Sequence, residues 1–199
     1  MRRCVFPSLT GDARMESALM QLVRKDHPLR RLFAGLVEQA FCAEVGVCDP
    51  GLTDYMAGLL VDFTHVDRLN AIRNAQGRRL DQIAAMLSVS CDDQPVSPAE
   101  RDRTMYRHIG DFTLFWAGLY PEQLKRTSPS DVLLDYVTNG KRSYAIVSEL
   151  ARENEQPPAS LFRHLSDEFE TCLHGLGLVR RSWEQRDLGR ADRSGGLVY

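Results

Sequence analysis

Apolar residues recur at helical spacing along much of this chain. Leu29, Leu32, Phe33, Leu36, Val37, Ala40 and Phe41 form one stripe, and Leu52 to Val66 repeats the pattern. Such spacing places the apolar side chains on one side of an α-helix. Asp49-Pro50-Gly51 lies between the two stripes and predicts a turn. We therefore expect two antiparallel neighbouring helices.

Further helices follow from start and stop signals. Ser97-Pro98-Ala99-Glu100 is a capping-box sequence with proline at the first helical position, which predicts a helix from there towards Tyr120. Pro121 is then expected to stop or kink this helix. Ser128-Pro129-Ser130-Asp131 predicts the start of another, whose apolar stripe runs from Leu133 to Ala151. A last helix is expected over Leu161 to Leu173, and a weaker pattern covers Ala13 to Arg24.

Gly140 lies within the apolar stripe of the helix expected after Asp131. Glycine costs a helix about 1 kcal/mol relative to alanine. Its position therefore indicates either a close contact with another helix or a break of the helix at Asn139-Gly140.

These patterns define the expected architecture. No segment shows the alternation of a strand, so we expect an all-α fold, an irregular bundle of about six to seven helices in a single compact domain over residues 1–185. Residues 186–199 are polar and rich in glycine, which predicts a flexible C-terminal tail.

Composition narrows the function classes. The net charge is −2, and it divides evenly, with 11 basic and 12 acidic residues in 1–96 and 14 and 15 in the rest. Nucleic-acid binding usually needs a concentration of Lys and Arg, so this balance disfavours it. The longest mainly apolar run, Phe112 to Tyr120, is far below the roughly 20 residues of a membrane-spanning helix.

The cysteines and the N-terminus bear on the compartment. The five cysteines form no CxxC pair, and their odd number fits neither a zinc ribbon nor a disulfide framework. The N-terminus is positively charged but lacks the apolar region of a signal peptide. We expect reduced thiols in a cytoplasmic protein of bacterial type.

The segment Tyr106 to Pro121 contains the main candidate site. Its aromatic residues are typical of a helix in the middle of a bundle, and His108 and Asp111 lie three residues apart beside them. At that spacing the carboxylate can fix the imidazole tautomer. A structural polar pair is the commoner role for such residues. The candidate pocket comprises His108, Asp111, Tyr106, Tyr144, Lys141, Asp62 and His65.

No cofactor and no metal are predicted. Asp62-Phe63-Thr64-His65 is the one acidic-x-x-His sequence, whereas di-iron bundles use two Glu-x-x-His motifs and two further glutamates. Asn139-Gly140-Lys141-Arg142-Ser143 lacks the spacing of a phosphate-binding loop, and we expect Lys141 to face water while Tyr144 packs inward.

Three functions stay open at this stage. The first is binding of a small molecule or a protein partner in the polar pocket, which as an enzyme would use His108 as general base oriented by Asp111. The second is a structural or regulatory interaction module that self-associates. The third is a helix-turn-helix over residues 79–96, which the acidic Asp92-Asp93 and the following Pro95 disfavour.

One segment resembles a known group of sequences. Arg107 to Glu122, RHIGDFTLFWAGLYPE, is similar to a phrase in uncharacterised bacterial helical proteins, and Gly140 to Tyr144, GKRSY, is similar to another of their phrases. The resemblance implies no activity, cofactor or catalytic residue.

Overall fold

The computed structural model describes residues 28–64, 97–127, 132–152 and 155–194. Every regular element in these ranges is helical, which confirms the all-α prediction. A π-helical segment, η1 (Gln39–Val45), accompanies seven α-helices: α2 (Pro28–Glu38), α3 (Pro50–Thr64), α6 (Pro98–Leu119), α7 (Pro121–Thr127), α8 (Val132–Leu150), α9 (Ala159–Asp167) and α10 (Phe169–Ser194).

Helix α6 begins and ends where the sequence predicts. The Ser97 hydroxyl accepts a hydrogen bond from the Glu100 amide at 3.3 Å, and Pro98 occupies the first turn, where it removes no needed donor. The helix ends at Leu119, just before Pro121 starts α7. Local chemistry thus fixes both ends of the helix that carries the candidate site.

The first two helices are joined differently from the prediction. The helix expected over residues 29–41 changes to π-helical geometry after Glu38, and Gly46, with φ of 84°, ends it in the left-handed region that glycine adopts at no steric cost. The turn predicted at Asp49-Pro50-Gly51 was wrong, since Pro50 and Gly51 already belong to α3. Asp49 Oδ1 accepts the Gly51 amide at 2.8 Å and so satisfies a free donor of the helix start.

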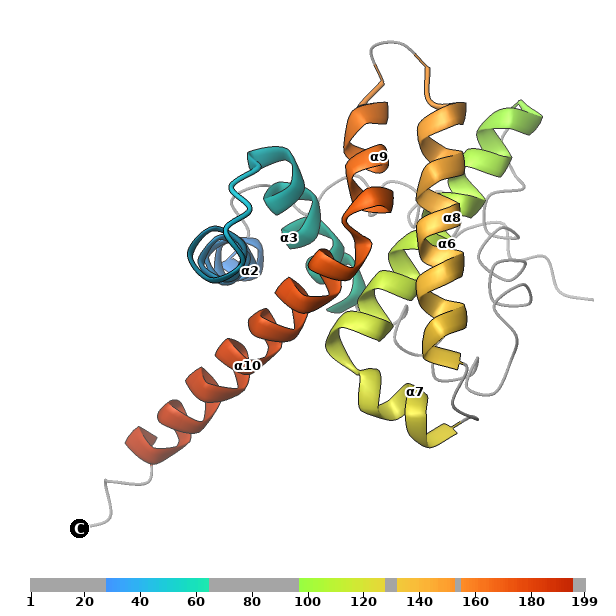
Figure 1. Ribbon diagram of the computed structural model, residues 1–199. Coiled ribbons are helices and arrows are strands. Elements are labelled where there is room, and N and C mark those ends of the chain that lie inside the picture. Colours follow the sequence, from blue (N-terminus) through green and yellow to red (C-terminus); the bar gives the residue numbers. More distant parts are fainter. Residues whose placement is uncertain (1–27, 65–96, 128–131, 153–154, 195–199) are drawn as a thin grey trace, which may run out of the picture.

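Helix α8 is continuous through Gly140, so the predicted alternative of a helix break is wrong and that of a close contact with another helix is confirmed. Gly140 is buried, and a Cβ at this position would lie 2.7 Å from Thr113 Oγ1 and against the Phe169 ring. Figure 1 shows α8 side by side with α9, and α8 also packs along α6. The missing side chain therefore lets α6, α8 and α10 approach one another.

The last predicted helix is two helices. The stripe from Leu161 to Leu173 is divided at Glu168, which ends α9, and α10 leaves in a new direction (Figure 1). Helix α10 continues through Ser194, so the boundary expected at residue 186 falls inside it. Its last turns extend away from the other helices (Figure 1). Trp183 joins it to α2, with its ring 4.8 Å from that of Phe33.

One apolar core unites α2, η1, α3, α6, α8, α9 and α10. Its largest side chains, all fully buried, are Tyr144, Phe33, Phe41, Phe162, Phe169, Leu36, Leu52, Met56, Leu60, Leu114, Leu165 and Leu176. None of the helices within the described ranges combines the length and the apolar character that a bilayer crossing demands.

Some predictions fall outside the described residues. These are the helix over Ala13 to Arg24, the helix-turn-helix over residues 79–96, the helix start at 128–131, and His65 of the candidate pocket.

Candidate functional site

The carboxylate of Asp111, on α6, connects three helices. The Tyr55 hydroxyl from α3 donates to Asp111 Oδ1 at 2.5 Å, and the Tyr144 hydroxyl from α8 donates to the same oxygen at 2.8 Å. Tyr144 is fully buried, and the Asp111 side chain keeps 14% of its surface exposed. Hydrogen bonds to a charged acceptor are about twice as strong as those between neutral groups, so this contact fixes α3 and α8 on α6.

Gly110 makes this arrangement possible. A Cβ at Gly110 would lie 2.7 Å from the Tyr144 ring, so only a glycine lets that ring lie on the α6 backbone. In this position the Tyr144 hydroxyl reaches the neighbouring Asp111. Gly110 therefore makes room for the Tyr144 ring, and Asp111 accepts the hydrogen bond from the Tyr144 hydroxyl.

Arg107, one turn before Asp111, supplies the positive charge of the cluster. Its Nε donates to the Tyr55 hydroxyl at 3.3 Å and lies 3.7 Å from Asp111 Oδ2. The guanidinium also lies over the Tyr55 ring, 5.4 Å from its centroid, and over the Phe162 ring at 5.8 Å. These cation–π contacts hold the guanidinium in place while leaving its terminal nitrogens for other partners.

The environment fixes the protonation states of the cluster. Burial, reinforced by the charge of Asp111, raises the pKa of Tyr55 and of Tyr144 well above the usual value, so both hydroxyls keep their protons and donate. Burial opposes the charge of Arg107, but the neighbouring Tyr55 and Asp111 outweigh it and raise the pKa. Arg107 is therefore a permanent cation here.

A cavity of about 210 Å³ lies beside this cluster. Its polar lining comes from Arg30, Asp54, Tyr55, Asp62, Arg107 and Asp111. Gly58, Leu59, Val61 and Pro157 complete the wall. One water needs about 10–15 Å³, and pockets for drug-sized ligands measure about 300–1,000 Å³, so this space has room for several waters and is smaller than such pockets.

The two carboxylate oxygens of Asp111 have different partners beside this cavity. Both tyrosine hydroxyls donate to Asp111 Oδ1. Within the described part of the chain, Oδ2 has only Arg107 nearby, at 3.7 Å, which exceeds hydrogen-bond distance. Asp111 thus retains an acceptor, and Arg107 retains donors, on side chains that line the cavity.

The expected hydrogen bond between His108 and Asp111 was wrong. The described partners of Asp111 are Tyr55, Tyr144 and Arg107. Residues four apart on a helix are separated by about 40° and residues three apart by about 60°, so Arg107 lies closer to the direction of Asp111 than His108 does. His108 is half-buried on α6 and is not among the residues of the cavity wall.

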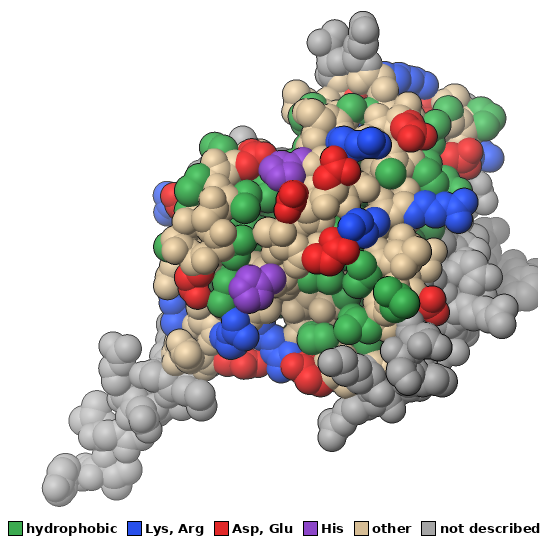
Figure 2. Space-filling view, viewed as in Figure 1, with side chains coloured by type: hydrophobic (Ala, Val, Ile, Leu, Met, Phe, Trp, Pro, Cys, Tyr) green, Lys and Arg blue, Asp and Glu red, His purple; other side chains and the backbone are tan. Residues whose placement is uncertain are grey.

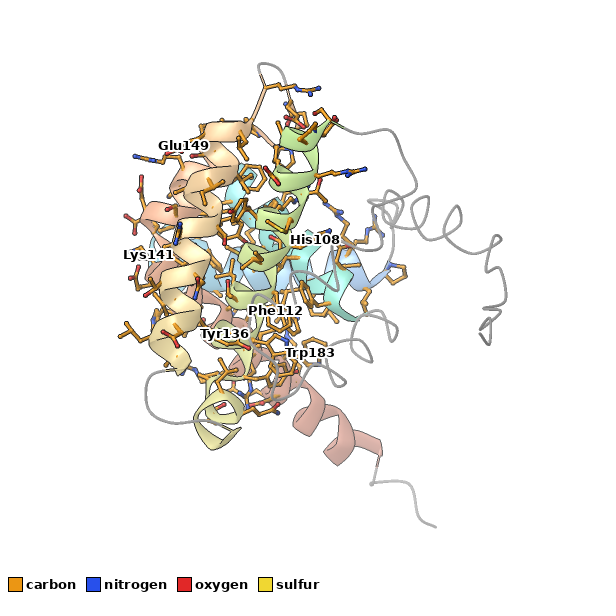
Figure 3. All side chains as sticks on the ribbon, turned by 90° about the vertical axis from the view of Figure 1, so that its right-hand side faces the viewer. His108, Phe112, Tyr136, Lys141, Glu149 and Trp183 are labelled. Carbon is orange, nitrogen blue, oxygen red and sulfur yellow. The ribbon has the colours of Figure 1, made fainter. Side chains whose placement is uncertain are left out.

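The other candidates divide into two groups. Asp62 lines the cavity, and Tyr144 belongs to the Asp111 cluster. Tyr106 is partly buried against the apolar core, and Lys141 donates to Glu170 at 2.9 Å. Figure 3 shows Lys141 on the outer side of α8 and His108 on α6, so these two do not converge.

Two acidic side chains away from the cluster are paired with basic groups. His164 Nδ1 lies 3.2 Å from Asp49 Oδ2, and Glu170 is bound by Lys141. Among the described residues, His, Cys, Asp and Glu side chains do not gather in groups of three or more.

The surface bears on the interaction-module alternative. Large apolar side chains exposed in the described ranges are Leu32, on α2, and Leu134, on α8. Figure 2 shows charges of both signs interspersed with small apolar areas on the face that it presents. Self-association stays a prediction.

Comparison of the chain with protein-family models, with curated proteins and with solved structures finds no match. The resemblance of the Arg107 to Glu122 segment to bacterial helical proteins accordingly stays a prediction.

Sequence reasoning missed Tyr55 and Arg107. Arg107 had a usable signal, because it lies four residues before Asp111, the spacing of a helical ion pair. Tyr55 belongs to the apolar stripe of α3, and a buried tyrosine hydroxyl needs a partner. Nothing local indicates that this partner lies 56 residues away.

Proposed function

We propose that this protein binds a small polar molecule in the cavity between α3 and α6. The observation that carries the proposal is the pair of uncommitted groups on the cavity wall, the Asp111 Oδ2 acceptor and the terminal donors of Arg107. Ligand sites in helical proteins typically combine a formed cavity with a few convergent polar groups held by surrounding contacts. The ligand would place a hydroxyl or amine near Asp111 and an acceptor near Arg107.

The rigidity of the cluster supports this proposal. Tyr55 and Tyr144 hold Asp111 from two helices, and two aromatic rings hold Arg107, so little side-chain entropy is left to lose when a ligand binds. A purely structural cluster needs no adjoining space, whereas this one has a cavity of about 210 Å³ beside it.

The five cysteines, without a CxxC pair, favour a reducing compartment, and we propose the cytoplasm.

Two glycine variants test the proposal with a matched control. Gly58 lines the cavity, and a Cβ there would meet only the Arg30 Nη1 atom, at 4.0 Å. The Cβ of Gly58→Leu therefore has room, and the rest of the leucine side chain is added on the cavity wall. Gly35, in α2, is exposed, and a Cβ there would have no neighbour within 4 Å, so Gly35→Leu makes the same change away from the cavity.

The measurement is native mass spectrometry after incubation with the small-molecule fraction of a cell extract. We expect a bound small molecule on the wild-type protein and on Gly35→Leu, and its loss on Gly58→Leu. Thermal unfolding of both variants checks that they fold. Equal retention by the two variants, or absence of any bound species on the wild type, would contradict the proposal.

A further inference from the structure

Two cysteines lie on either side of the C-terminal end of η1. Cys42 belongs to η1 and is half-buried, whereas Cys48 lies in the segment before α3 and is exposed. Both are free thiols, as is Cys172 on α10. Cys42 and Cys48 are part neither of the apolar core nor of the cavity wall. Neither core packing nor the proposed function therefore accounts for this pair.

The backbone of this segment brings the two cysteines together. Gly46, with φ of 84°, lets the chain turn back after η1, and the Val47 amide donates to the Phe41 carbonyl at 2.9 Å. Each cysteine is the next residue after one of these two hydrogen-bonded partners. The hydrogen bond therefore holds the two cysteine-bearing stretches side by side.

The side chain of Cys42 points at the backbone that carries Cys48. Its Sγ donates to the Val47 carbonyl oxygen at 3.7 Å, and that carbonyl belongs to the peptide bond between Val47 and Cys48. The interaction with the Cys48 thiol raises the pKa of Cys42 to about 11. Two cysteines whose thiols interact in this way need little backbone movement to form a disulfide.

The residue after Cys48 connects this pair with two helices. Asp49 Oδ1 accepts the Gly51 amide at the start of α3 at 2.8 Å, and Asp49 Oδ2 lies 3.2 Å from His164 Nδ1 of α9. A covalent bond from η1 to Cys48 would therefore fix the point at which the chain enters α3.

We propose that Cys42 and Cys48 form a peroxide-sensitive dithiol, which hydrogen peroxide converts to a reversible disulfide between η1 and the start of α3. In reducing compartments such disulfides are usually transient and redox-sensing, which agrees with the free thiols of this structure. The pair lies outside the cavity wall, so this inference goes beyond the proposed function and does not depend on it.

The chemistry assigns a separate step to each cysteine. The raised pKa leaves little of Cys42 as the reactive thiolate, so the exposed Cys48 reacts first. Its thiolate attacks one peroxide oxygen, the O–O bond breaks, and the hydroxide released takes up the thiol proton as water. The Cys42 sulfur then attacks the sulfenic acid of Cys48, the S–O bond breaks, and a second water leaves with the Cys42 proton. Two thiols are oxidised, and one peroxide is reduced to two waters.

The first test maps the disulfide in the full chain. Reduced protein is treated with hydrogen peroxide, alkylated under denaturing conditions, and digested with trypsin without reduction. Residues 32–68 form one tryptic peptide that contains Cys42 and Cys48 and no other cysteine. We expect this peptide to escape alkylation and to be lighter by two hydrogen atoms, and dithiothreitol to restore both thiols.

Cys172 is the internal control of this test. It is buried, and burial raises its pKa to about 12, so it should remain a thiol and be alkylated. Alkylation of Cys42 and Cys48 to the same extent as Cys172 after peroxide would overturn the inference. A disulfide from either cysteine to a different peptide would also overturn it.

The second test separates the steps with variants and dimedone, a reagent that traps sulfenic acids. In Cys42→Ser the sulfenic acid of Cys48 has no thiol to attack it, so we expect the dimedone adduct on Cys48 to accumulate beyond the wild-type level. Cys48→Ser should lose the disulfide and leave Cys42 reduced. Cys4→Ser and Cys91→Ser are the matched controls and should retain the disulfide. Equal adduct in Cys42→Ser and the wild type, or loss of the disulfide in either control, would overturn the assignment, and thermal unfolding checks that each variant folds.

Discussion

Removing the Tyr144 hydroxyl tests the Asp111 cluster most cleanly. Tyr144→Phe keeps the ring, which is fully buried against Gly110, and removes the 2.8 Å hydrogen bond to Asp111. Asp111 retains Tyr55 and Arg107, so the carboxylate is not left without partners. The perturbation is therefore the loss of one hydrogen bond to a charged acceptor.

Such a hydrogen bond contributes about 1.5–3 kcal/mol to stability. For a chain of this size, 1 kcal/mol shifts the melting temperature by about 2–4 °C. We therefore expect Tyr144→Phe to lower the free energy of unfolding by about 1.5–3 kcal/mol and the melting temperature by about 3–12 °C. Urea denaturation and calorimetry measure these two quantities.

Tyr136→Phe is the matched control. Tyr136 lies on the same helix as Tyr144, is partly buried close to Phe112 (Figure 3), and has no hydrogen-bond partner within the described residues. Its substitution should change stability by less than about 0.5 kcal/mol. Equal effects of the two substitutions would refute the assignment of Tyr144 as a structural donor to Asp111.

Three further predictions concern helix packing, pH and the link between cluster and cavity. Gly140→Ala should destabilise by about 1–3 kcal/mol, because its methyl group would meet Thr113 and Phe169, whereas Gly35→Ala, with open space, should stabilise by up to about 1 kcal/mol in urea denaturation. Burial raises the pKa of Tyr55 and Tyr144 above the ordinary value of 10.0, so the stability that the two protonated tyrosines contribute is complete below about pH 10. It is lost as the pH rises further, by roughly 1.4 kcal/mol per pH unit for each tyrosine. Unfolding followed by tyrosinate absorbance should therefore show a smaller alkaline loss of stability in Tyr144→Phe than in the wild type. Asp111→Asn should weaken binding of the cavity ligand about tenfold or more, because an amide is a poorer acceptor than a carboxylate, and native mass spectrometry under competition measures this loss.

The extent to which sequence predicts this fold depends on how local the determinants are. Helix α6 could be predicted to within a residue because Ser97, Pro98 and Pro121 act on their immediate neighbours. At Gly140 the sequence left open whether the helix breaks or lies in close contact with another helix. The close contact is with Phe169, which lies 29 residues away, so no local pattern could reveal it. The division of the last predicted helix at Glu168 also escaped prediction, since the apolar stripe continues across it and neither proline nor glycine signals the change of direction.

The candidate site shows the same limit. Asp111 and Tyr144 were named from the sequence, and both belong to the cluster, but His108 was given the place that Arg107 occupies. Charge and the four-residue spacing favour the arginine, which an amphipathic pattern alone does not reveal. Tyr55 gains its role from a tertiary contact with Asp111, so no local motif marks it.

The proposed function requires that a small molecule enters the cavity beside Asp111. The most direct measurement is a backbone amide NMR spectrum of the labelled protein before and after addition of the small-molecule fraction of a cell extract. We predict that the shifted signals concentrate at Gly58, Leu59, Arg107 and Asp111, which line the cavity, and that Gly58→Leu abolishes these shifts. Shifts that concentrate elsewhere, or a spectrum without change, would contradict the account.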